Sequence, residues 1–139
     1  GTDGREQGVD SPLPASRDVR RDTAMELARR RHTAVLLSGP EDLVTDGERV
    51  WCVTGGSDQM SLVTGTGCML SVLCGVFAAV EPDAAVAAAL ASAFWKACSR
   101  RAERLSGGRG SGSFRTALLD AANTLTAPDT AREAEITAL

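Results

Sequence analysis

A Gly-Thr-Gly-Cys run at residues 65–68 combines the residue types that hold an anion beside a reactive thiol. Glycine at positions 65 and 67 lets the backbone approach a ligand closely, because neither residue carries a Cβ atom. The apolar stretch that follows predicts a helix to about Val80, and the first N–H groups of a helix have no partner within it. With the helix dipole they form a pocket that suits a phosphate. The alternative is that the two glycines only make a turn.

Cys68 falls in the first turn of this predicted helix. The positive end of the dipole stabilises a thiolate there, and a thiol beside a bound phosphate can accept a proton or act as a nucleophile. The alternative is a buried cysteine that only packs. The other three cysteines, Cys52, Cys74 and Cys98, lie in apolar stretches and are expected to be buried.

A thiol enzyme that uses Cys68 as its nucleophile would need a base such as histidine nearby. The only histidine, His32, precedes a predicted strand, so we expect it at the end of the sheet opposite the loops. A Cys–His pair is therefore disfavoured. No C-x-x-C pair is present, which also disfavours a structural zinc site, and we predict no metal-ligating residues.

Length and charge narrow the function classes further. A chain of 139 residues suits one domain, and its net charge of −3 provides no basic surface for nucleic acid. No apolar run reaches the roughly 18–20 residues that span a bilayer. The polar N-terminus differs from a signal peptide. We therefore expect a cytoplasmic protein that binds neither nucleic acid nor membrane.

The elements that position the Gly-Thr-Gly-Cys run follow from periodicity and turn signals. We predict a helix over about 18–31, a strand over 33–38 buried on both faces, and a hairpin over 43–54 that turns at Asp46-Gly47. Three helices follow, over about 68–80, 83–105 and 114–125. This order predicts an α/β fold. One buried strand and a hairpin are few for a doubly wound sheet, so we expect part of a larger sheet.

Two more loops are candidates for the same site. Ser38-Gly39 ends the predicted buried strand, where ligands of open α/β sheets usually bind, and the Ser38 hydroxyl can donate to a phosphate oxygen. The glycine-rich segment 110–113 opens the last helix and is placed to border a nucleotide.

Four segments, in this order, resemble consecutive motifs of the hydroxyethylthiazole kinase family, within the ribokinase-like superfamily. They are Ser38-Gly39-Pro40-Glu41-Asp42, Val44-Thr45-Asp46-Gly47, Val63-Thr64-Gly65-Thr66-Gly67-Cys68, and Gly110-Ser111-Gly112-Ser113-Phe114 with Leu119-Asp120. Gly8-Val9-Asp10-Ser11 is similar to a segment that precedes them in the family. Cysteine at position 68 is the most specific element, because most sugar and vitamin kinases of the superfamily carry Asp there.

The resemblance implies ATP-dependent phosphorylation of the primary alcohol of 4-methyl-5-(2-hydroxyethyl)thiazole, a salvage step toward thiamine, with Mg²⁺ accompanying the ATP. It implies that Ser38 and Gly39 lie at the ATP and that Gly65 contacts the thiazole. Gly65, Thr66 and Gly67 would form the anion hole with Cys68, which takes the place of the catalytic base.

The resemblance also implies the C-terminal half of a three-layer αβα domain. We expect a flexible segment over 1–16, the half-domain over 17–126 and a peripheral tail over 127–139. In the family an N-terminal half supplies much of the sheet, a Met beside the thiazole and an Arg on the nucleotide. Family members are trimers with active sites at subunit boundaries, so a homotrimer, an assembly with an N-terminal half, or both are expected. A degenerate domain that binds nucleotide or a partner without catalysis is the alternative, and the natural length and the alcohol stay open.

Overall fold

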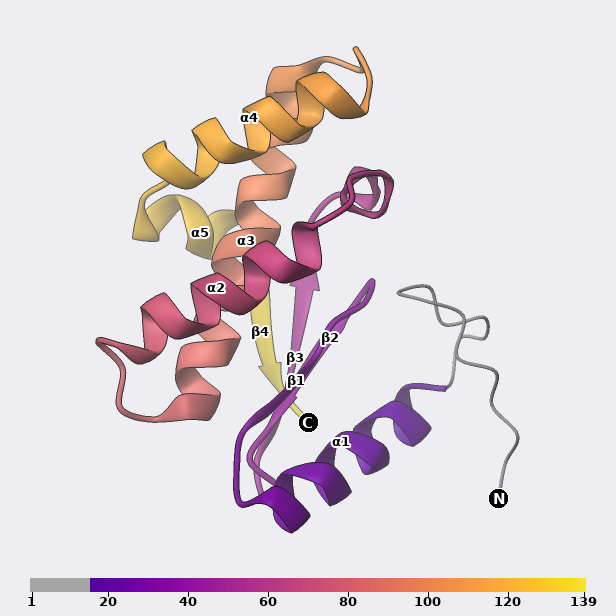
Figure 1. Cartoon of the computed structure of the whole chain (residues 1–139), viewed down its shortest axis with the longest axis vertical. Coiled ribbons are helices and arrows are strands. Elements are labelled where there is room, and N and C mark those ends of the chain that lie inside the picture. Colours follow the sequence, from indigo (N-terminus) through magenta and orange to yellow (C-terminus); the bar gives the residue numbers. More distant parts are fainter. Residues whose placement is uncertain (1–15) are drawn as a thin grey trace.

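A computed structural model describes residues 16–139 of the protein. These residues form a sheet flanked by helices (Figure 1). The expected flexible segment over 1–16 and the Gly8–Ser11 motif thus lie almost wholly outside the described residues. The elements are, in order, α1 (Arg17–Arg31), β1 (Val35–Leu37), β2 (Asp42–Thr45), β3 (Val50–Gly55), the 3₁₀ helix η1 (Asp58–Leu62), α2 (Thr66–Ala78), α3 (Ala84–Ser106), α4 (Ser111–Thr124), α5 (Ala127–Glu133) and β4 (Ala134–Ala138).

The sheet has the order β1-β2-β3-β4, and every pairing is antiparallel. The predicted hairpin is confirmed as β2 and β3, in which Thr45 pairs with Val50 across the Asp46-Gly47 turn. Gly47 has a φ of 98°, which glycine adopts without a steric penalty. Because β1 and β3 are both antiparallel to β2, their C-terminal ends lie at the same end of the sheet.

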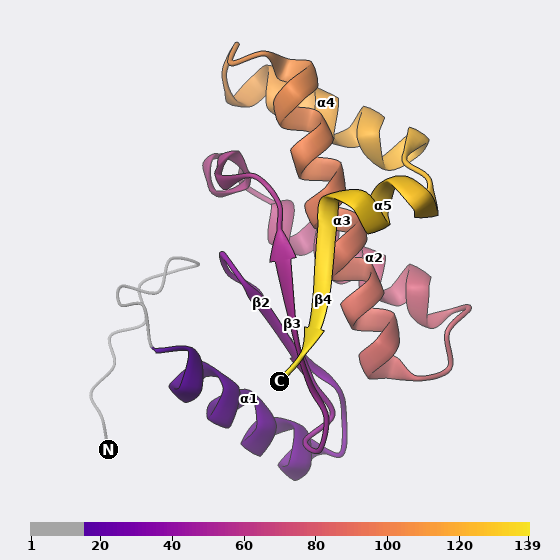
Figure 2. The ribbon, with the colours of Figure 1, turned by 180° about the vertical axis from the view of Figure 1, so that it is seen from behind.

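Helices cover both faces of the sheet, which makes three layers (Figures 1 and 2). Successive strand residues alternate between faces. Val44 and Val53 pack against the alanines of α3, so Leu43 and Cys52 point to the other face, which α1 covers with the buried Ala24 and Ala28. The predicted α/β class is therefore confirmed.

Two segments differ from the sequence-based expectation. The prediction that the strand over 33–38 is buried on both faces is wrong. In the structure this segment is β1, a short strand at one edge of the described sheet, and its residues are only half-buried. Residues 127–139, which we expect to be a peripheral tail, form α5 and then the largely exposed strand β4, which pairs along β3 from Trp51 to Gly55 at the other edge. Helix α4 begins at Ser111, so the glycine-rich segment supplies its first turn.

The alanine-rich helix α3 forms the centre of the core. Ala91, Ala97 and Ala102 are fully buried, as expected for a helix that neighbours approach closely. Helices α2 and α4 pack against α3, with Leu70 of α2 and Phe114 of α4 in the shared cluster. This packing fixes where α2 and α4 begin.

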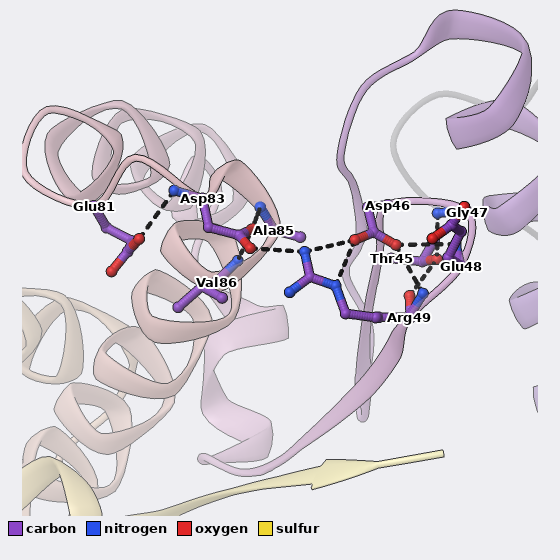
Figure 3. A network of polar contacts seen from close by, with 9 residues as sticks. All are labelled: Thr45, Asp46, Gly47, Glu48, Arg49, Glu81, Asp83, Ala85 and Val86. Atoms are coloured by element: carbon purple, nitrogen blue, oxygen red, sulfur yellow. Dashed lines mark hydrogen bonds and ion pairs between the residues drawn. The ribbon is translucent and has the colours of Figure 1, made fainter.

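A polar network ties the hairpin turn to the start of α3 (Figure 3). The Arg49 guanidinium donates to the carboxylates of Asp46 and Asp83, each at 2.7 Å. Asp83 also caps α3 by accepting from the N–H groups of Ala85 and Val86. Burial alone raises the pKa of the Asp46 carboxyl, but N–H donors of Arg49 and Glu48 and the Arg49 guanidinium outweigh it and lower this pKa to about 2.

We predict that acid weakens the fold through Asp46. Because the folded pKa of about 2 lies below the ordinary value of 3.8, the carboxylate stabilises the fold fully above about pH 5. That contribution, up to about 2 kcal/mol, is lost as the pH falls from about 5 to below 2. Urea unfolding of wild type and Asp46→Asn should therefore differ at pH 7 and converge near pH 2. A difference that does not change with pH would contradict the prediction.

Candidate functional site

The Gly-Thr-Gly-Cys run opens α2, as predicted. Gly65 is the N-cap residue with a φ of 97°, in the left-handed region that favours glycine. The Met69 N–H bonds to the Gly65 carbonyl at 2.9 Å. The N–H groups of Gly67 and Cys68 have no acceptor among residues 16–139. This turn thus has the free donors and the dipole direction that suit an anion.

Helix α3 and η1 hold this turn in place. Trp95, buried on α3, donates its indole N–H to the Thr66 carbonyl at 3.1 Å. The Thr66 hydroxyl lies 3.2 Å from the Met60 carbonyl and 3.3 Å from that of Val63. Thr66 is therefore bound on the protein side, whereas the next two residues, Gly67 and Cys68, are exposed.

The outer side of the turn is open. A Cβ atom built on Gly65 or on Gly67 would meet no heavy atom within 4 Å. Cys68 is exposed, which excludes the alternative of a buried cysteine that only packs. The turn thus has room for a ligand beside a thiol.

The remaining cysteines have other surroundings. Cys52 and Cys98 are buried, as expected, whereas Cys74 is only half-buried. Burial raises the pKa of the Cys52 and Cys74 thiols and brings that of Cys98 to about 12. His32 is exposed and caps α1 just before β1, at the end of the sheet opposite the β1–β2 loop. The structure gives no support to a Cys–His pair.

The other two predicted loops lie at the same end of the sheet as the start of α2 (Figures 1 and 2). Ser38 and Gly39 follow β1 and are exposed, and the Ser38 hydroxyl has no hydrogen bond within the described part of the chain. Gly110 opens α4 with a φ of 111°, and α4 contacts η1, which precedes the Gly-Thr-Gly-Cys turn. The three loops, although far apart in sequence, thus lie toward the same end of the sheet.

Sequence reasoning missed a buried ion pair behind the Ser38-Gly39 loop. Lys96 of α3 lies 3.4 Å from the Asp42 carboxylate, and both side chains are almost fully buried. One signal was available, because Lys96 is the only lysine of the chain and stands in an apolar stretch of helix. A cation in that setting needs a specific partner.

A comparison with protein families decides the classification. The model of the hydroxyethylthiazole kinase family matches residues 1–128.

The chain belongs to the hydroxyethylthiazole kinase family.

Two relatives and one solved structure show how far the likeness extends. The chain is 42% identical over 130 residues to a hydroxyethylthiazole kinase of Desulforudis audaxviator, covering 94% of this chain and 44% of the relative. It is 42% identical over 136 residues to one from Methanoculleus marisnigri, covering 98% and 47%. A solved structure of a hydroxyethylthiazole kinase protein from Pyrococcus horikoshii matches with a TM-score of 0.82 at 28% identity, covering 88% of this chain and 47% of that one.

The chain spans about half the length of the curated relatives it matches. Its fold corresponds to part of the kinase domain, as the sequence predicted. No helix within residues 16–139 is long and apolar enough to cross a membrane.

We predict that the exposed thiol of Cys68 reacts with an alkylating reagent before the buried thiol of Cys98. Iodoacetamide at pH 8 should modify exposed Cys68 first and leave buried Cys98, with its pKa of about 12, unmodified until the protein unfolds. Peptide mass mapping after timed quenching measures this order. Modification of Cys98 at the same rate as Cys68 would contradict the described packing.

Proposed function

We propose that this chain carries the anion hole and catalytic base of an enzyme that transfers the γ-phosphoryl group of ATP to the alcohol of 4-methyl-5-(2-hydroxyethyl)thiazole. The observation that carries the proposal is the start of α2. There the exposed thiol of Cys68 adjoins the free N–H groups of Gly67 and Cys68, and no heavy atom fills the space beside Gly65 and Gly67. Membership of the hydroxyethylthiazole kinase family supports this substrate.

Each residue has a role that its position supports. The N–H groups of Gly67 and Cys68 donate to a phosphate oxygen and stabilise negative charge that develops there. The Cys68 sulfur accepts the proton of the attacking alcohol, and Gly65 leaves room for the thiazole. The exposed Ser38 hydroxyl, beside Gly39, donates to an oxygen of the nucleotide. Phosphoryl transfer depends mainly on positioning and charge stabilisation, so a modest base suffices.

ATP and Mg²⁺ are the cofactors of this proposal. ATP supplies the phosphoryl group and Mg²⁺ offsets the charge of its phosphates. The open glycine turn with its free donors fits a phosphate. Residues 16–139 contain no group of three or more His, Cys, Asp or Glu side chains that would hold a metal. Mg²⁺ would accompany the ATP in this proposal, and we assign no protein ligand to it.

A partner polypeptide completes the site in this proposal. Several apolar side chains on α2 and next to it are exposed, namely Leu62, Val72, Val76 and Val80. Val72 and Val76 stand four residues apart, on one face of α2, and exposed apolar side chains on one helix face suit a protein interface. We propose an N-terminal half of the same kind of enzyme, a homotrimer, or both, in the cytoplasm. Intact-mass analysis and light scattering of protein purified from its source identify the components.

The test of function is phosphoryl transfer by that purified protein. ADP release that depends on the thiazole alcohol, together with a product heavier by one phosphoryl group, supports the proposal. Nucleotide binding without turnover would favour the degenerate binding domain. Alkylation of Cys68 that MgATP does not slow would argue against its place beside the phosphates.

A further inference from the structure

The loop between β1 and β2 directs five successive carbonyl oxygens toward two cations. Arg20 of α1 donates to the Leu37, Ser38 and Glu41 carbonyls, the last at 2.9 Å. Lys96 of α3 donates to the Gly39 carbonyl at 3.3 Å and to the Pro40 carbonyl at 3.1 Å. The two helices lie on opposite faces of the sheet, so the loop is held from both sides.

The Asp42 carboxylate completes this arrangement. One of its oxygens accepts from the Gly39 N–H at 2.8 Å and lies 3.4 Å from the Lys96 ammonium. The other oxygen accepts from the Ser92 hydroxyl at 2.7 Å. Asp42 is 4% exposed and Lys96 is 6% exposed. Every polar atom of the pair is thus satisfied, and the pair is tied to the loop rather than to solvent.

The buried Lys96–Asp42 pair is not expected to add much to the free energy of unfolding by itself. Removing two charges from water costs free energy that their attraction only partly offsets, and apolar side chains of equal size often serve as well. The hairpin turn at the other end of the sheet is held by the exposed Arg49 network instead (Figure 3). The buried ammonium group of Lys96 therefore lies against the β1–β2 loop, whose carbonyl groups it orients.

The shape of that loop matters for an anionic ligand. Carbonyl oxygens that faced the site would repel phosphate, whereas here all five are turned toward Arg20 and Lys96. The Ser38 hydroxyl is left exposed. Arg20 also fills the space beside Gly39, where a Cβ atom would lie 2.7 Å from a guanidinium nitrogen. The loop is thus preorganised with its donor outward.

We propose that Lys96, together with Arg20, is a positioning residue for nucleotide binding, which turns the carbonyls of residues 37–41 inward and presents the Ser38 hydroxyl to the nucleotide. This inference rests on the proposed kinase function and deepens it. Lys96 does not touch the nucleotide, so its effect must act through Ser38.

The test is a double-mutant cycle on the protein with any partner that copurifies. The paired change D42N/K96M removes both buried charges together, and the amide oxygen introduced at position 42 can still accept from the Gly39 N–H. Ser38→Ala removes the hydroxyl, and it is also combined with the paired change. Fluorescence of bound methylanthraniloyl-ATP measures affinity, and initial rates give KM for ATP and KM for the alcohol.

We expect Ser38→Ala to weaken analogue binding about 10-fold in the wild-type background, the effect of a hydrogen bond to a charged group. In the D42N/K96M background Ser38→Ala should weaken analogue binding less than about 2-fold, because the hydroxyl is already misplaced. There KM for ATP should rise about 10-fold over wild type, while KM for the alcohol stays within about 2-fold. Additive effects, or unchanged affinity in D42N/K96M, overturn the inference.

Two further variants keep the result decisive. Arg49→Met removes a cation at the far end of the sheet and should leave analogue affinity within about 2-fold. Arg20→Met leaves no buried charge unpaired and should reproduce the Ser38-dependent loss even where the D42N/K96M protein folds poorly. Absence of analogue binding by wild type overturns both proposals. If wild type binds the analogue and the D42N/K96M and Arg20→Met proteins bind it with the same affinity, only the role of Lys96 and Arg20 is overturned.

Discussion

Cys68→Ala is expected to lower kcat for phosphorylation of the thiazole alcohol by about 10²–10⁴-fold, the usual contribution of a general base. The Cβ atom is kept and Cys68 is exposed, so the fold should be unaffected. The N–H donors of the α2 turn belong to the backbone and remain in place. KM for ATP should therefore change by no more than a few fold, which steady-state kinetics can measure.

The matched control is Cys74→Ala, on the same helix and with the same change in chemistry. Cys74 packs against the core and lies outside the first turn of α2, so its loss should lower thermal stability slightly and leave kcat within about 2-fold. An equal loss of kcat in both variants, or full activity in Cys68→Ala, would remove Cys68 from the mechanism.

Gly65→Ala is expected to reduce kcat/KM at least about 10-fold. Alanine at a φ of 97° is strained by roughly 1–2 kcal/mol, so the turn will shift or the added methyl will occupy the open space above it. Either outcome displaces the Gly67 and Cys68 donors or blocks the ligand. Loss of one such donor typically costs about 10²–10³-fold in kcat.

Gly107→Ala separates strain from function. Gly107 ends α3 with a φ of 56°, and a Cβ atom there also meets nothing within 4 Å. Both variants should therefore lose some thermal stability, but Gly107→Ala should keep kcat/KM within about 2-fold. A similar loss of activity in both would mean that backbone strain, rather than the α2 turn, explains the Gly65 result.

Local features of this protein were readable from its sequence. The hairpin follows from Asp46-Gly47 between two apolar runs, and α1 and α3 follow from periodicity and from the breaks at their ends. These elements depend on neighbouring residues, whose backbone preferences act without the rest of the fold. The Gly65–Cys68 turn belongs to the same class, because two glycines before a helix prescribe free N–H donors wherever the helix packs.

Only the tertiary structure decided which segments meet. Strand β1 reads as a doubly buried strand because Val35, Leu36 and Leu37 are all apolar, yet it forms an edge of the described sheet. Strand β4 and the pairing of Lys96 with the loop before Asp42 link residues tens of positions apart. Such contacts depend on how helices and strands pack, and a one-dimensional pattern carries no distance between them. The sequence by itself therefore determined the Gly65–Cys68 turn with its free N–H donors and its thiol, whereas packing decided that Lys96 and Asp42 lie behind the Ser38 loop.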